Sequence, residues 1–275
     1  MSISKILFLL NSDAIRWCIL KILFKKNGLK LSYFKSYKSN RFFIYCVNGI
    51  YLASESINWY ISLQEFENHC TTTSINFYKP KKGDTVLDIG AGLGEEVVVY
   101  SNAVGSSGRV VAVEANPDVC KVLKNIIELN KILNVEVLNI ALNPILEVVT
   151  INAEVESYLS GSLQRTEASV EGFEVEGINL SEIMKKYKIE VVDLLKVNIE
   201  GAERFLADEN RFDIFENIKN IAISCHDFRY RKEGLEFFRT KELISAFFQD
   251  RGYQINSQST GIEYVDDWIY GVRKY

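Results

Sequence analysis

From residue 86 onward, short apolar runs alternate with longer stretches in which apolar residues recur at helical spacing. The short runs suit strands buried on both faces, and the longer stretches suit helices with one buried face. The helical spacing is clearest at Val119, Val122, Leu123, Ile126 and Ile127. Such alternation predicts a parallel α/β sheet. We expect its strands at Val86–Ile89, Arg109–Val113, Val135–Ile140, Val191–Val197 and Ile218–Cys225.

The alternation is interrupted twice. Between the third and fourth strands, Glu147–Asn152 and Phe173–Val175 predict a small hairpin, with a loop over 157–171. At the end of the chain, Tyr253–Ser257 and Trp268–Val272 are strand-like runs with no helical stretch between them. A last strand reached in this way can enter the sheet antiparallel to its neighbours. The sequence therefore predicts seven strands, the last of them antiparallel.

The segment before this domain begins with an apolar helix. Ser12 or Asp13 can cap it, and it runs to about Lys26. A helix this apolar is expected to be buried on the main domain, paired with a second copy, or laid on a membrane surface. One apolar stripe comprises Ile15, Cys18, Ile19, Ile22 and Leu23, and a second face comprises Trp17, Leu20 and Phe24.

A hairpin follows this helix. Arg41–Val47 and Ile50–Ala53 read as two strands joined by Asn-Gly, the strongest short hairpin signal. A further helix is expected over Ile57–Glu67. We therefore divide the chain into a basic extension at residues 1–54 and a main domain at residues 55–275.

Charge is unevenly distributed over the 275 residues. The formal net charge is −4, and residues 1–40 carry eight basic residues and one acid, +7, which leaves −11 for the remainder. No overall field favours nucleic acid, whereas the basic helix is open to a peripheral membrane contact or a homo-oligomer contact. The odd number of scattered cysteines argues against a disulfide framework and favours a cytoplasmic location.

The stretch VLDIGAGLGE at 86–95 joins a predicted strand to a predicted helix through a glycine-rich turn. Glycines there let the backbone approach a ligand and adopt positive φ. The dinucleotide fingerprint is G-x-G-x-x-G, but after Gly90 and Gly92 the third glycine comes one place early, at Gly94. A carboxylate at Asp88 can accept hydrogen bonds from an ammonium group and would repel a pyrophosphate. The pattern D-x-G-x-G-x-G therefore favours S-adenosylmethionine over NAD.

Two further strand ends suit a nucleoside. Ligands of doubly wound sheets bind at the carboxyl ends of strands, near the point where strand order reverses. Glu114 follows the second strand, where an acid can accept hydrogen bonds from both ribose hydroxyls. Ala141 and Leu142 follow the third strand and could line an adenine ring. These positions alone do not separate S-adenosylmethionine from NAD.

The fourth strand runs into K-V-N-I-E-G-A-E at 196–203. Together with the glycine turn, this segment resembles the FkbM-type family of S-adenosylmethionine-dependent methyltransferases, whose members share K-[IV]-D-[VI]-E-G-A-E. The family aspartate is Asn198 here, which keeps an acceptor oxygen and loses the charge. The resemblance covers roughly Ile57 to the C-terminus. The matching positions are Lys196, Glu200, Gly201, Ala202 and Glu203.

The resemblance implies a class I methyltransferase fold, which is Rossmann-like and has the antiparallel last strand expected above. It also implies methyl transfer from S-adenosylmethionine, usually to a hydroxyl of a sugar, polyketide or similar metabolite. Asn198 would then hold the cofactor or the acceptor by hydrogen bonds. The acceptor is expected to be a small molecule or glycan and not a nucleic acid.

The fifth strand ends in Ser-Cys-His-Asp at 224–227, at the same edge of the sheet. Imidazole has a pKa close to working pH, so we predict His226 as general base, oriented by Glu200 or Asp227. In one alternative, these residues and Asn198 surround a divalent cation that activates the hydroxyl. In another, His226 only caps the following helix. The main prediction includes no metal.

Two other functions stay open. An NAD-dependent oxidoreductase would use the same strand ends for a dinucleotide. A non-catalytic relative that acts as a binding protein or membrane-docked scaffold would account for Asn198 and for the basic extension.

Overall fold

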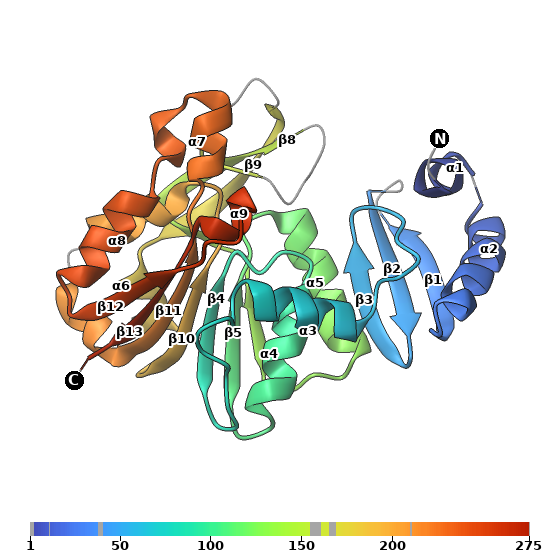
Figure 1. Cartoon of the computed structure of the whole chain (residues 1–275), viewed down its shortest axis with the longest axis horizontal. Helices are drawn as coiled ribbons and strands as arrows, with labels where there is room; N and C mark the ends of the chain where they lie inside the picture. The colour runs from blue at the N-terminus through green and yellow to red at the C-terminus, as the bar shows by residue number, and fades with distance from the viewer. Residues whose placement is uncertain are drawn as a thin grey trace.

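The computed structural model describes residues 3–10, 12–37, 41–154, 161–164, 169–209 and 211–274. Its central sheet has the strand order β12-β13-β11-β10-β4-β5-β6 (Figure 1). The strands from β11 to β6 are parallel, and β13 is antiparallel to both of its neighbours, so the predicted seven-stranded sheet is confirmed. The strands are β4 (Thr85–Ile89), β5 (Arg109–Val113), β6 (Val135–Leu138), β10 (Val192–Val197), β11 (Ile218–Ser224), β12 (Tyr253–Ser257) and β13 (Trp268–Arg273).

Each face of this sheet buries an apolar core of its own, because successive residues of a strand point to opposite faces. Val110 and Ala112 lie in one core, and Val111 and Val113 lie in the other. The first core is covered by α3 (Leu63–Thr72), α4 (Glu95–Val104) and α5 (Pro117–Leu129). The second is covered by α6 (Leu180–Lys186) and α8 (Lys241–Gln249).

Shorter elements complete the main domain. They include the helices α7 (Asp227–Glu233) and α9 (Glu263–Asp266). Three 3-10 segments lie at Ala202–Asp208, Phe212–Asn217 and Glu236–Phe238. A small second sheet contains β7 (Ala141–Leu142), β8 (Glu147–Glu154) and β9 (Ser169–Ile178). The hairpin expected between the third and fourth strands is confirmed by the antiparallel pairing of β8 with β9. Of the loop expected over 157–171, residues 157–160 and 165–168 lie outside the described residues.

Two expectations about helices are wrong. The helix expected over Ile57–Glu67 begins only at Leu63, because Ser62 caps it by accepting a hydrogen bond from the Glu65 N–H at 3.2 Å. Ile57 and Ile61 are buried from a non-helical segment instead. A short helix, α9, also lies between β12 and β13, where no helix was expected.

The extension comprises two helices and an antiparallel three-stranded sheet at one end of the molecule (Figure 1). The hairpin around Asn48-Gly49 is confirmed, and both turn residues have positive φ, 52° and 87°. Neither the first helix nor the first strand is predicted by the sequence pattern. The elements are α1 (Ile3–Leu9), α2 (Asp13–Lys26), β1 (Leu31–Tyr37), β2 (Phe42–Val47) and β3 (Ile50–Ser54).

The extension packs closely on the main domain. Asn130 at the end of α5 accepts a hydrogen bond from the Tyr51 N–H and donates one to the Tyr51 carbonyl, each at 2.8 Å. Buried Leu20 and Phe24 of α2 belong to the same apolar core as Tyr100 of α4. The division of the chain near residue 55 therefore stays a prediction, since the two parts share a core.

A buried arginine fixes the corner between α1 and α2. The Arg16 guanidinium donates to the carbonyls of Leu7 and Phe8 at 3.0 and 2.9 Å, and to Asp13 Oδ1 at 3.0 Å. Asp13 Oδ2 in turn accepts from both the N–H and the hydroxyl of Ser36 on β1, at 2.9 Å. The last carbonyls of α1 have no partners within their own helix, so Arg16 supplies them and ties α1 to α2 and β1.

We predict that Arg16→Ala lowers the free energy of unfolding by roughly 3 kcal/mol, because buried carbonyls and Asp13 lose their charged partner. Chemical denaturation followed by circular dichroism measures this change. Arg211→Ala is the matched control, since Arg211 pairs with Asp213 on the surface and its loss should leave the midpoint unchanged. An equal shift in both variants would contradict a structural role for Arg16.

Candidate active site

The candidate site lies where the strand order of the central sheet reverses, between β4 and β10. Gly90 follows β4 with a φ of 86°, and a Cβ atom there would lie 1.9 Å from the carbonyl oxygen of Asn198, which follows β10. Only glycine fits this crossing of two backbones. Gly94, with a φ of 92°, begins α4, and a Cβ there would lie 2.5 Å from Leu123 Cδ1. The predicted glycine turn thus places the start of α4 at the carboxyl edge of the sheet.

Two adjoining cavities open at this edge. Both are lined by Gly90, Glu114, Asn198 and Glu200. The first, which we name the apolar cavity, is also lined by Ile140, Ala141, Leu142, Ile151 and Leu163. The second, the acidic cavity, is also lined by Gly92, Glu95, Glu96, His69 and Trp268. The structure therefore brings Gly90, Glu114, Ala141, Asn198 and Glu200 together, as the sequence predicts.

Glu114 is fixed between the two cavities by main-chain groups. Its Oε2 accepts from the Gly92 N–H at 2.9 Å, and its Oε1 accepts from the Asn116 N–H at 2.8 Å. Burial raises the pKa of Glu114 to about 7, although these two hydrogen bonds act in the opposite direction. The carboxylate is thus held rigidly, and its charge can change near neutral pH.

A buried ion triad lies behind the glycine turn. The Lys196 ammonium pairs with Asp88 Oδ1 at 2.9 Å and Glu96 Oε2 at 2.6 Å, and donates to the Gly90 carbonyl at 2.8 Å. Burial raises the pKa of Asp88 to about 6 even though Lys196 opposes this shift. Burial would raise the pKa of Glu96, but the charge and hydrogen bond of Lys196, together with Ser74 and His69, lower it.

The triad changes the interpretation of Asp88. Its side chain is fully buried and lines neither cavity, so it pairs with Lys196 instead of facing a ligand ammonium. Glu95 and Glu96, at the start of α4, line the acidic cavity together with Glu114 and Glu200. Neither glutamate is among the site residues predicted from the sequence. The signal for them was their position directly after the third glycine of the turn.

His226 lies between two carboxylates. Its Nδ1 is 2.9 Å from Glu203 Oε1, and its Nε2 is 3.6 Å from Glu200 Oε1. Burial lowers the pKa of the imidazole, but Glu203 and Glu200 outweigh burial and raise it to about 10. The ring is therefore an imidazolium at neutral pH. A cation that already carries both protons does not suit the role of general base.

Glu200 lines both cavities, as Glu114 does, and two cations hold its carboxylate there. Arg229 donates to Glu200 Oε2 at 2.7 Å. The backbone of Glu200 has a φ of 53°, which is uncommon for a residue other than glycine. Burial would raise the pKa of this carboxyl, but His226 and Arg229 lower it to about 2. Glu200 is thus ionised throughout the physiological range.

Asp227 does not join this network. Its Oδ2 accepts from the backbone N–H groups of Thr240 and Lys241 at 3.0 and 2.8 Å, which satisfies the first turn of α8. Its predicted role in orienting His226 is therefore revised to that of a helix cap. The residue that orients His226 is Glu203, which also accepts from the Thr240 hydroxyl at 2.7 Å and the Gly201 N–H at 2.9 Å.

Asn198 lies in the lining of both cavities. Its backbone N–H donates to the Ile89 carbonyl at 2.9 Å, and its amide forms no hydrogen bond with another of the described side chains or backbone groups. The amide is thus available to a ligand. Within the described parts of the chain, no group of three or more His, Cys, Asp and Glu residues is arranged to hold a metal ion.

Comparison with known proteins gives a family. The model of the methyltransferase FkbM domain matches residues 88–255. A search of the curated proteins gives no match.

Among solved structures, the chain is similar to Methylobacillus flagellatus KT methyltransferase FkbM, with 16% identity, a TM-score of 0.48, and coverage of 76% of this chain and 50% of that chain. It is similar to Aeropyrum pernix fibrillarin in complex with S-adenosyl-L-methionine, with 14% identity, a TM-score of 0.45, and coverage of 88% and 99%. A SAM-dependent methyltransferase from Aquifex aeolicus gives 15% identity, a TM-score of 0.40, and coverage of 77% and 97%. At these values we infer no shared activity.

The FkbM model, however, spans more than half of the 275 residues and includes both sequence motifs, and the chain therefore belongs to the FkbM family of methyltransferases.

Proposed function

We propose that the protein uses S-adenosylmethionine to methylate a hydroxyl oxygen of a small molecule or glycan. The observation that carries this proposal is the acidic cavity at the glycine turn, where Glu95, Glu96, Glu114 and Glu200 face one space. The amino-acid part of S-adenosylmethionine carries an ammonium and a sulfonium against one carboxylate, so its net charge is positive, and the carboxylates of the cavity favour such a cation. A dinucleotide would instead bring a pyrophosphate, which these carboxylates repel.

The residues present fit this cofactor. The close crossing at Gly90 leaves the backbone of the turn open to a ligand. Glu114 is aimed between the cavities, where an acid can accept from ribose hydroxyls. The apolar cavity, with Ala141 and Leu142 in its wall, suits an adenine ring. When bound, the cofactor supplies a methyl group that is already activated by positively charged sulfur.

The chain itself has to align the acceptor and receive its proton. Glu200 accepts a hydrogen bond from the acceptor hydroxyl, while Arg229 and His226 keep the carboxylate ionised and oriented. A carboxylate of low pKa is a weak base for a free alcohol. An oxygen that is forming a third bond is far more acidic, so Glu200 can receive the proton late in the reaction. Alignment of this kind supplies a large share of enzymatic rates.

His226 is then a positioning residue. Its proton on Nδ1 is held by Glu203, and its Nε2 faces Glu200. The amide of Asn198 takes the place of the family aspartate beside Glu200 and can hold the acceptor or the cofactor by hydrogen bonds. Because the charged residue of this pair is Glu200, the loss of charge at position 198 leaves the proton acceptor in place.

Calorimetry with the purified protein tests the cofactor. We predict binding of S-adenosylmethionine and none of NAD, and Glu114→Ala should weaken binding by roughly 1–3 kcal/mol through the loss of ribose hydrogen bonds. Binding of NAD without S-adenosylmethionine would establish the oxidoreductase alternative instead.

The affinity should also depend on pH. Glu114 and Glu95 have pKa values of about 7, raised by burial, so both become neutral as the pH falls below that value. A cationic ligand favours the ionised forms, so the affinity for S-adenosylmethionine should fall by up to about tenfold for each pH unit and each group. Adenosine, which lacks the charged amino-acid part, should show a smaller change. Equal pH dependence for the two ligands would contradict this account.

Labelled methyl transfer into a small-molecule extract tests the role of Glu200. We predict that Glu200→Gln lowers the apparent kcat by about 10²–10⁴ with little effect on cofactor affinity. Asp227→Asn is the control, because a cap of α8 affects stability and not turnover.

Two results would reassign the proton acceptor. A rise of kcat through about pH 6.5 that disappears in His226→Gln would make neutral imidazole the base. Loss of activity in a chelator, restored by magnesium, would assign activation of the hydroxyl to a metal ion.

A further inference from the structure

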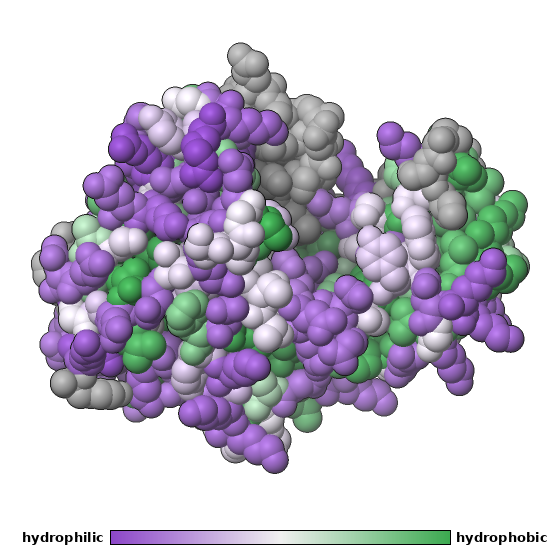
Figure 2. Space-filling view, in the orientation of Figure 1, coloured by the Kyte–Doolittle hydropathy of each residue, from purple (hydrophilic) through white to green (hydrophobic). Residues whose placement is uncertain are grey.

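The extension carries an exposed apolar surface that its own packing does not use. The exposed fractions are 51% for Ile15 and 60% for Ile22 on α2, and 44%, 51% and 65% for Ile6, Phe8 and Leu9 on α1. Figure 2 shows apolar side chains gathered on the outer side of these two helices, at the end of the molecule away from α8. We name these five residues the outer face. Large apolar side chains clustered in this way mark an interaction surface.

The outer face is preformed. Arg16 holds the carbonyls of Leu7 and Phe8 and thereby fixes α1 against α2. Leu20 and Phe24 bury the opposite side of α2 in the core of the extension. Of the predicted stripe, Ile15, Cys18 and Ile22 are exposed, whereas Ile19 and Leu23 pack partly buried against the core. The exposed part therefore needs no reorganisation to be presented.

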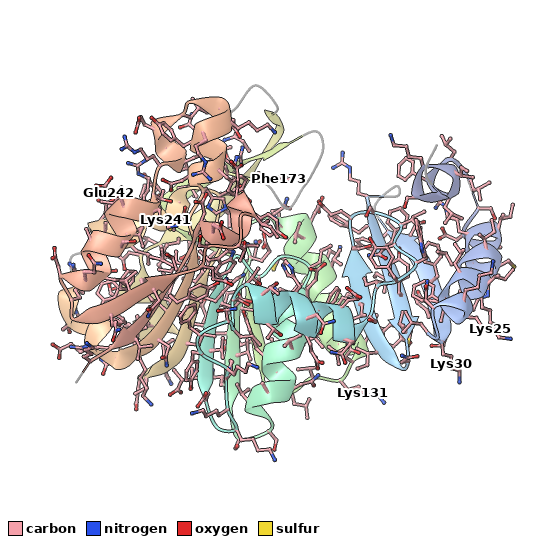
Figure 3. The ribbon with its side chains drawn as sticks, in the orientation of Figure 1. Lys25, Lys30, Lys131, Phe173, Lys241 and Glu242 are labelled. Atoms are coloured by element: carbon pink, nitrogen blue, oxygen red, sulfur yellow. The ribbon has the colours of Figure 1, made fainter. Side chains whose placement is uncertain are left out.

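Exposed lysines accompany the outer face. Lys21, Lys25 and Lys26 of α2 are exposed, as are Lys5 on α1 and Lys30 after α2. Figure 3 shows Lys25 and Lys30 at the end of α2, pointing away from the protein. Residues 1–40 carry +7 against −11 for the remainder of the chain, so positive charge is concentrated on this one part of the molecule. Apolar residues and lysines together on a surface helix suit an anionic lipid surface.

We propose that α1 and α2 dock the protein on the surface of an anionic membrane. The outer face enters the boundary between headgroups and acyl chains, and the lysines contact the lipid phosphates and carboxylates. The protein does not cross the bilayer through these elements, because no described helix has the length and apolar character of a membrane span. Docking of this kind requires neither the cofactor nor the acceptor.

Co-sedimentation with vesicles tests the proposal. The full chain should sediment with vesicles of phosphatidylcholine mixed with phosphatidylserine, and much less with phosphatidylcholine alone. High salt should weaken the binding. Lys25→Glu/Lys26→Glu should lower the partition by at least about 20-fold, since each lysine near an anionic surface contributes roughly a factor of five.

Matched variants separate this surface from general effects of charge and apolarity. Lys185→Glu/Lys232→Glu makes the same change in net charge at exposed positions of α6 and α7 and should bind as the unchanged protein does. Ile15→Gln/Ile22→Gln should lose binding, whereas Leu243→Gln, at an exposed leucine of α8, should keep it. All four variants replace exposed side chains, so unchanged thermal unfolding will show that they are folded.

Three outcomes would overturn the proposal. These are absence of binding to anionic vesicles, equal binding to neutral ones, and equal loss in the α2 and control variants. Sedimentation velocity tests the competing occupant of the outer face, which is a second copy of the chain. A dimer that dissociates in Ile15→Gln/Ile22→Gln, without vesicle binding, would assign the outer face to a second copy of the chain.

Discussion

A single buried ammonium group, that of Lys196, determines how the centre of this fold is assembled. It bonds to a carboxylate on β4, a carboxylate on α4 and the carbonyl of Gly90 in the turn between them. Removing such a charge from water is costly unless every proton has a partner, so β10, β4 and the start of α4 are stable only in one mutual arrangement. In that arrangement the backbones at Gly90 and Asn198 approach closely, and both residues line the two cavities, as Glu114 does.

A second line of charges holds the acid that faces the cavities. Glu203, His226, Glu200 and Arg229 alternate in sign along a chain of contacts, and Glu200 is the member that lines the cavities. Each carboxylate offsets the burial of the cation beside it, which explains why the pKa of His226 is raised while that of Glu200 is lowered. The same contacts keep the Glu200 backbone at a positive φ. Local strain held by surrounding interactions is common where a side chain has to point in a fixed direction.

In the extension, the two apolar faces of α2 have different surroundings. One face of α2 joins the core that α3, α4 and α5 share, and the other stays at the surface beside lysines. Arg16 fixes the position of α2, because it donates hydrogen bonds to carbonyls of α1 and pairs with Asp13, which accepts from β1. The extension thus shares a core with the main domain on one side and exposes apolar side chains on the other.

The sequence by itself determined the strand and helix alternation of the central sheet, the antiparallel last strand, the hairpin at Asn48-Gly49 and the position of Glu114 beside the glycine turn, but not α1, β1 or α9. These features depend on local periodicity, turn chemistry and motif spacing, each of which is set by residues that lie close together in the sequence. The tertiary structure decided the partners of charged groups. Asp88 pairs with Lys196 from a strand more than a hundred positions later, Asp227 caps α8, and two carboxylates on another segment, Glu203 and Glu200, raise the pKa of His226. It also decided which apolar face of α2 is buried, because two faces of similar apolarity compete and only packing in the folded chain selects Leu20 and Phe24 for the core. Charge pairing and burial act through space, so the roles of these residues could be assigned only once the chain was folded.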